Sequence, residues 1–219
     1  MKLIYNFYVV LFSSLCFYSC NSGKENVTIK ETALALKEKQ KRQDSIIDKY
    51  LTNGAQKYSY NSPQWQLEID KGLEVDSTIA YLWQQKAMPL FKQGKYEIGM
   101  EFVDKAVLYN RERWQSYRAF IKCVFAKTYR EAIIDFEDYK KRFGNIGYVM
   151  DHTYDFHIAL SYLQLNEFEK AEELFTKDYE KQLAEKGKEW LHPVDLFYFG
   201  ISKYELGKYD KLLKYLILH

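Results

Sequence analysis

Apolar and polar residues alternate most regularly in residues 155–175. Apolar side chains recur at helical spacing up to the polar residues 166–167, and the spacing resumes at Phe168. Ala159 and Ala171 stand on the two sides of this interruption, where small side chains allow antiparallel helices to approach closely. The pattern predicts a helical hairpin.

The same pattern occurs in three other segments of the chain. An aromatic residue opens the second half of each segment, and these residues are Tyr96, Tyr129 and Tyr209, which correspond to Phe168. The four aromatic residues are separated by 33, 39 and 41 residues. Near-regular spacing of this length is typical of stacked helical repeats. Insertions are expected between hairpins, at residues 141–150 and 179–192.

The second helix of each predicted hairpin carries a small residue four positions before a larger one. Small residues allow the two helices of a hairpin to pack closely, and larger ones fill the groove against the next hairpin. The pairs are Gly99/Val103, Ala132/Phe136 and Ala171/Phe175, whereas the bulky pair Leu212/Leu216 departs from the rule.

This spacing resembles the A-x3-F signature of tetratricopeptide repeats (TPR). Trp83 stands where that family has a first-helix tryptophan, and Ala87 and Gly200 stand at its glycine position, whereas the second hairpin matches least well. The resemblance implies an all-α fold over residues 61–219. That fold is a right-handed α-solenoid of about four to five TPR-like helical hairpins.

Residues 30–60 are predicted to form a polar helix and a loop that precede the array. The helix ends at Asn53-Gly54, because glycine tolerates the left-handed conformation at a helix C-terminus. The basic residues 37–42 form either a solvated helix face or a contact for anionic lipid headgroups. Pro63 opens the next helix, which resembles the second helix of a TPR unit, so the array begins there or one helix earlier. Its predicted apolar face carries Trp65, Ile69, Gly72 and Leu73.

The first twenty residues have the features of a secretory signal. Lys2 precedes an apolar run over residues 3–17, which is short for a membrane-spanning helix. Cys20 follows a small residue and resembles the lipidated cysteine of a bacterial lipobox. The sequence therefore predicts a lipoprotein signal peptide at residues 1–19 and a lipidated tether at 20–29. Plain secretion and a signal anchor are the alternatives.

Charge and cysteine content narrow the functional classes. The chain has 32 basic and 30 acidic side chains, which gives no electrostatic footprint for nucleic acid. Signal cleavage and lipidation would leave only Cys123, so no intramolecular disulfide is possible in that product. Cys123 lies in an apolar helical context and is interpreted as a buried structural thiol.

No string of residues indicates catalysis. The sequence lacks the Walker loop, the HExxH motif and the GxSxG motif. In the polar segment 151–157, His152 and Asp155 could share a helix face, but His157 points elsewhere. We therefore expect a helix N-terminus capped by Asp151 and no metal site, no cofactor and no enzymatic activity.

The resemblance also implies a concave surface lined by first-helix residues. Pro89 lies within one of these helices, where proline removes a hydrogen bond, so a kink near Gln85 or a break in the helix is expected. The candidate groove residues are Tyr81, Gln84, Met88, Phe91 and Lys92, then Phe156, Leu160, Leu163 and Gln164, and finally Phe197, Ile201, Tyr204 and Glu205.

These features indicate a membrane-tethered scaffold for protein–protein interaction. We expect it in the bacterial cell envelope, held by lipid on Cys20 at the outer membrane, with the array facing the periplasm. Its partner is an unidentified protein. The alternative is the binding of a small ligand, a glycan or a peptide in the concave groove.

The chain ends in an apolar segment that lacks the polar cap usual for repeat arrays. We predict that Leu213 and Ile217 on this segment contact a partner or a second copy of the chain. The alternative is that the segment turns inward and is covered by its own hairpin. Replacing both with charged residues should then abolish that association, which light scattering and partner capture would measure. An unchanged mass together with unchanged capture would contradict the prediction.

Overall fold

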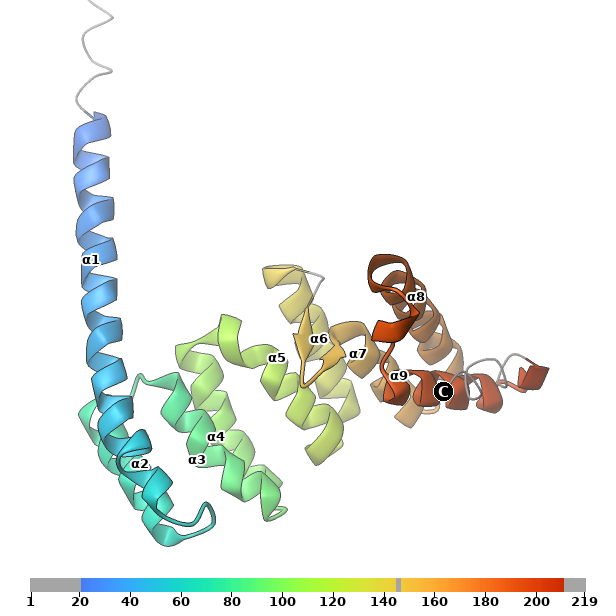
Figure 1. The fold of residues 1–219 in the computed structure, drawn as a ribbon, viewed down its shortest axis with the longest axis horizontal. Helices are drawn as coiled ribbons and strands as arrows, with labels where there is room; N and C mark the ends of the chain where they lie inside the picture. Colours follow the sequence, from blue (N-terminus) through green and yellow to red (C-terminus); the bar gives the residue numbers. More distant parts are fainter. Residues whose placement is uncertain (1–20, 145–146, 211–219) are drawn as a thin grey trace, which may run out of the picture.

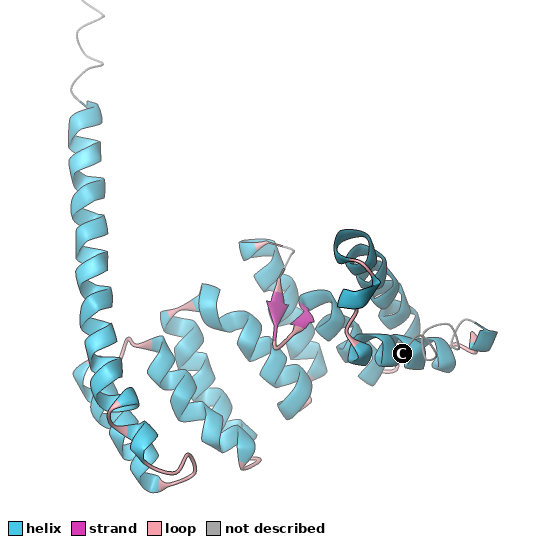
Figure 2. Ribbon diagram, viewed as in Figure 1, coloured by secondary structure: helices cyan, strands magenta, loops and turns pink. Residues whose placement is uncertain are grey.

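The computed structural model describes residues 21–144 and 147–210, with side chains described from residue 32. This part of the chain is helical apart from one short β-hairpin (Figures 1 and 2). Consecutive helices pack against each other along a single row, so the all-α solenoid expected from the sequence is confirmed. The predicted signal peptide, the lipidation site Cys20 and the C-terminal residues Leu213 and Ile217 lie outside the described residues.

The helices follow one another with short connections. Their bounds are α1 Asn21–Ile47, α2 Pro63–Val75, α3 Ala80–Lys92, α4 Tyr96–Tyr109, α5 Arg111–Ile121, α6 Tyr129–Phe143, α7 Tyr154–Gln164, α8 Phe168–Lys186 and α9 Pro193–Glu205. Strands β1 Tyr148–Val149 and β2 His152–Thr153 pair in antiparallel register between α6 and α7. Helices α3 and α4, α5 and α6, and α7 and α8 form three of the four predicted hairpins. The fourth begins with α9, and most of its predicted second helix lies outside the described residues.

The second helices of these hairpins begin at the aromatic residues that the spacing singled out, Tyr96, Tyr129 and Phe168. The small residue of each pair is buried against the first helix. At Gly99, an added β-carbon would lie 2.5 Å from the Phe91 ring, so only glycine permits this approach. Ala132 and Ala171 are fully buried at the equivalent places. The small-to-large pattern is thus confirmed as a helix-packing device.

The packing is continuous across residue 61, where the sequence placed the start of the array. Helix α1 continues through a π-helical turn at Asp48–Thr52, and the segment 21–29, expected as a tether, is part of that helix. Ile46 and Leu51 share one apolar core with Ile69 of α2. The end of α1 therefore forms an additional hairpin with α2, ahead of the predicted hairpins and one helix earlier than residue 61.

Gly54 ends this first helix for a reason other than the predicted one. Its φ angle is −115°, so it does not adopt the left-handed conformation. A β-carbon at this position would lie 2.4 Å from the carbonyl oxygen of Tyr50. Glycine is required here because the backbone of the turn passes directly over the preceding helical turn.

Helix α3 runs through Pro89 without a break, so the predicted interruption is absent. Proline at this position cannot donate a hydrogen bond to the carbonyl of Gln85. The indole Nε1 of Trp65 in α2 donates to that carbonyl instead, at 3.4 Å, and Gln66 donates to the neighbouring Lys86 carbonyl at 3.1 Å. The neighbouring helix therefore supplies the donor that proline lacks.

In its described residues, the first predicted insertion contains the end of α6 and strand β1. The second is mostly a lengthening of α8, which has 19 residues. Asp151 does not cap α7, because it lies in the tight turn of the β-hairpin with a φ angle of 70°. The hydroxyl of Thr153 caps α7 and accepts the Phe156 N–H at 2.9 Å.

Cys123 is a free and buried thiol, as its apolar context predicted. Burial raises its pKa to about 11, although the Ser161 hydroxyl, which donates to the sulfur at 3.3 Å, acts in the opposite direction. A thiol with this pKa stays protonated at neutral pH. The residue fills space between α5 and α7, which is the structural role expected of it.

Candidate functional site

A groove runs along the edge of the array where the first helices begin. It consists of adjoining depressions of about 410 Å³ and 420 Å³ that share Asn110 and Arg113. One lies between α1, α3 and α5, and the other lies between α5, α6 and the β1–α7 segment. We call it the tyrosine groove, and its principal lining residues are Lys39, Gln43, Tyr81, Tyr109, Asn110, Arg113, Trp114, Tyr139, Tyr148 and Tyr154.

Helix α5 builds the centre of the groove. The side chain of Asn110 caps α5 by accepting the Arg113 N–H at 3.1 Å, which turns the chain sharply after α4. Tyr81, in the first turn of α3, stacks on Trp114 with ring centroids 6.1 Å apart and planes at 9°. The Arg113 guanidinium lies over the same indole at 5.0 Å. Aromatic rings and a cation therefore form this part of the floor.

The β-hairpin closes the other end of the groove. Tyr148 projects from β1, and Lys186 of α8 donates to its hydroxyl at 2.5 Å and lies over its ring. Tyr139 packs edge-on against Tyr154 and donates its hydroxyl to the Glu112 carbonyl at 3.0 Å. Burial, with the neighbouring Tyr154, raises the pKa of Tyr139 to about 12, so its hydroxyl remains a hydrogen-bond donor.

Helix α1 forms one wall of the groove and is held in place by Asp76. Gln43 and Arg42 of α1 donate to the Asp76 carboxylate at 3.1 Å and 3.3 Å. Thr78 donates both its backbone N–H and its hydroxyl to the same carboxylate. Burial alone would raise the pKa of Asp76, but these hydrogen bonds outweigh it and lower the pKa to about 2.

Few of the predicted concave-surface residues line this groove. Tyr81 does so and is 38% exposed. The others are buried (Gln84, Phe91, Phe156 and Leu163), half-buried (Met88, Leu160 and Ile201) or exposed elsewhere (Lys92, Gln164, Phe197, Tyr204 and Glu205). The buried side chains fill the hairpin interiors, as Phe91 does against Gly99 and Phe156 against Phe175.

Sequence reasoning missed most of the groove because its residues come from seven separate elements, which are α1, α3, α4, α5, α6, β1 and α7. A usable signal existed near the second hairpin, where Tyr109, Asn110 and Trp114 combine a helix cap with flanking aromatic residues. No pattern in the sequence indicated that Tyr148 would be brought beside them, since its position depends on the β-hairpin. His152 and Asp155 do not pair either, because Asp155 forms an ion pair with Lys140 at 2.5 Å.

Comparison with known proteins supports the fold. No family model and no curated protein matches the chain. Among solved structures, the MamA RS-1 ArsTM double mutant matches with a TM-score of 0.56 at 12% identity, over 70% of this chain and 80% of that one. The MamA MSR-1 C2 structure matches with a TM-score of 0.53 at 13% identity, over 80% and 92%. MamA contains tetratricopeptide repeats. The fold is TPR-like.

Within residues 21–144 and 147–210, no helix combines the length and the apolarity that are needed to cross a bilayer. Helix α1 has 27 residues, but its sequence is polar.

Asp76→Asn should weaken the attachment of α1. Because the folded-state pKa lies below the ordinary value of 3.8, the carboxylate stabilises the fold above pH 3.8, and this contribution is lost as the pH falls toward 2. Loss of a buried, charge-assisted acceptor costs about 1–3 kcal/mol. Urea unfolding at pH 7 should show this loss, and the gap between the two proteins should narrow below pH 4. A gap that stays constant with pH would contradict the assignment.

Proposed function

We propose that this protein is an interaction scaffold that holds a partner protein by an extended peptide segment in the tyrosine groove. The observation that supports this most strongly is the line of exposed tyrosines, Tyr81, Tyr109 and Tyr148, along an open groove of a TPR-like array. Tyrosine gives a large, rigid contact area and a hydroxyl for hydrogen bonding, which makes it common at protein interfaces.

The shape of the groove favours an extended peptide over a compact ligand. The adjoining depressions follow one another from α1 across α5 to the β-hairpin, and each is open to solvent. Their volumes, about 410 Å³ and 420 Å³, are each large enough for side chains of a bound segment. Asn110, which lies between them, is placed to contact the backbone of a chain that occupies both.

The charges in the groove indicate the kind of segment that fits. Lys39 lines the depression beside α1, Glu112 lines the one beside the β-hairpin, and Arg113 lines both. A segment with a carboxylate near an aromatic or apolar residue would satisfy both the cations and the tyrosine rings. Such complementarity mainly sets the specificity and the rate of association.

We further propose that the scaffold is tethered to a membrane of the bacterial cell envelope through lipid on Cys20, at the outer membrane and facing the periplasm. The sequence of residues 1–20 supports this proposal. Helix α1 extends away from the hairpins (Figure 1). The part of α1 that precedes the groove wall, residues 21–38, is about 27 Å long at roughly 1.5 Å per residue. A rigid spacer of this length would keep the groove clear of the lipid headgroups.

The double variant Tyr81→Ala/Tyr148→Ala tests the groove. Peptides selected from a random display library against the intact protein should bind it more than tenfold less tightly in this variant, because interface tyrosines are frequent hot spots. Fluorescence anisotropy gives the affinities. Tyr96→Ala/Tyr58→Ala is the matched control, since these tyrosines have similar exposures, 37% and 45%, and do not line the groove.

Equal losses in the two double variants would contradict peptide binding in the groove. If no peptide is selected while small saccharides raise the melting temperature of the parent protein and not of the groove variant, the groove is a ligand-binding site instead of a docking site for protein. The comparison of the two double variants therefore distinguishes peptide docking in the groove from the binding of a small ligand.

Cys20→Ala tests the tether. Without an acylated cysteine the protein should move from the membrane fraction to the soluble fraction, and it should no longer incorporate a labelled fatty acid. Fractionation and labelling of cells that express each form measure the two effects. Retention of the variant in the membrane, or an unlabelled parent protein, would exclude lipid on this residue.

A further inference from the structure

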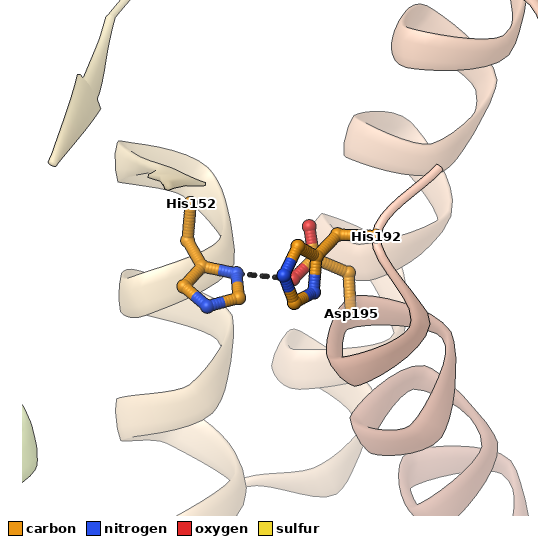
Figure 3. Close-up of side chains that lie close together, drawn as sticks. All are labelled: His152, His192 and Asp195. Atoms are coloured by element: carbon orange, nitrogen blue, oxygen red, sulfur yellow. Dashed lines mark hydrogen bonds and ion pairs between the residues drawn. The ribbon is translucent and has the colours of Figure 1, made fainter. Parts of the chain in front are cut away.

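A cluster of metal-ligand residues lies where the third hairpin meets α9. His152 comes from β2, immediately before α7, and His192 and Asp195 come from the start of α9 (Figure 3). One potential ligand atom from each of the three side chains lies within 4.8 Å of the others. Forty residues separate the two histidines, so no local sequence motif indicated that they meet.

Neighbouring contacts hold the cluster together. The Nδ1 atom of His152 lies 2.5 Å from an oxygen of Asp195, and its ring stacks on Phe156 with centroids 4.4 Å apart. The His152 and His192 rings meet edge-on at 4.5 Å. His192 is the N-cap of α9, and Asp195 lies in its first turn. Both histidines are therefore positioned by the backbone at the beginning of a helix.

The surroundings of the cluster favour a cation. A small depression beside it is lined by His192, Asp195, Asp178 and Gln182 together with aromatic and aliphatic side chains. No lysine or arginine is among its lining residues in the described part of the chain. The side chains of His152 and Asp195 are 16% and 12% exposed. An ion could enter from solvent and would then be largely shielded from it.

We propose that His152, His192 and Asp195 bind a divalent transition-metal ion such as Zn²⁺. Two imidazoles and one carboxylate are a donor set that zinc accepts, and they leave one position for water or for a group from a partner. Magnesium and calcium prefer oxygen donors throughout and fit this set poorly.

The ion would replace the direct contact between His152 and Asp195. Metal–ligand distances of about 2.0–2.2 Å in a tetrahedral site place donor atoms roughly 3.3 Å apart. Small side-chain rotations bring the three groups to that spacing, because the closest pair now lies at 2.5 Å and the widest within 4.8 Å. His192 must also give up the bond in which its Nδ1 accepts the Val194 N–H at 3.2 Å if that nitrogen is the ligand.

A bound ion would join two parts of the array. His152 belongs to the third hairpin, and His192 and Asp195 belong to α9, so coordination adds a direct link across the junction between units. The unfolded chain does not bring these residues together, so binding stabilises the folded state. This role is independent of peptide binding in the tyrosine groove, whose lining residues do not include the three ligands.

Isothermal titration calorimetry of the intact, metal-free protein with zinc chloride tests the proposal. One ion should bind per chain, and the melting temperature should rise with zinc. Asp195→Asn and His192→Gln should each weaken binding by more than about 100-fold, because even the loss of an outer-shell partner commonly costs 10–100-fold. Magnesium chloride at the same concentration should neither bind nor raise the melting temperature.

Glu189→Gln is the matched control, because it removes an exposed carboxylate three residues before His192 that is not one of the proposed ligands. His219→Ala removes the one histidine that lies outside the described residues. Both variants should bind zinc as the parent protein does. Circular dichroism of each variant without metal shows whether it is folded, so a loss of binding can be separated from a loss of structure.

The proposal is overturned if folded Asp195→Asn and His192→Gln proteins bind zinc as tightly as the parent, or if zinc fails to bind the parent at all. In either case His152 and Asp195 form a structural hydrogen bond between β2 and α9 and nothing more. It is also overturned if His219→Ala alone abolishes binding, since the ion would then occupy a different site.

Discussion

The close approach of two helices at a small residue is the constraint on which this structure depends. The Phe91 ring occupies the space that any side chain at Gly99 would need, and Ala132 and Ala171 allow similar contacts in the following hairpins. Each hairpin is therefore narrow enough to present one flat side to the next. Because the hairpins stack in this way, the starts of the first helices fall along one edge of the array.

The tyrosine groove and the cluster of His152, His192 and Asp195 both lie near the starts of first helices. A helix N-terminus needs acceptors for its free N–H groups, and Asn110, Thr153 and His192 supply them for α5, α7 and α9. The caps bring polar side chains and sharp turns to the edge of the array, and the aromatic residues beside them remain accessible there. The tyrosine groove and the His152 cluster thus arise from the same local requirement, met by different residues in successive units.

The sequence predicted the fold well and the groove poorly, for a physical reason. Helical periodicity, small-residue spacing and the aromatic residues that open the second helices are local, and they recur in every unit. Residues that are buried inside a hairpin and residues that face the groove alternate along the same first helix. The packing of the neighbouring hairpins decides which of these two environments each residue has. Phe156 and Phe197 look equivalent in the repeat pattern, yet Phe156 is buried against Phe175 whereas Phe197 is half exposed.

The sequence pattern of residues 155–175 and of the three similar segments was enough to predict helical hairpins and the residues where their second helices begin. The apolar sequence around Cys123 was enough to predict that this thiol is buried. Only the tertiary structure decided how local conflicts are resolved and which distant residues meet. The continuity of α3 through Pro89 depends on a donor from Trp65 in the neighbouring helix, and the glycine at position 54 is required by contact with Tyr50. His152 and Asp195 meet across 43 residues of chain. Such contacts depend on how whole units pack, which no local pattern encodes.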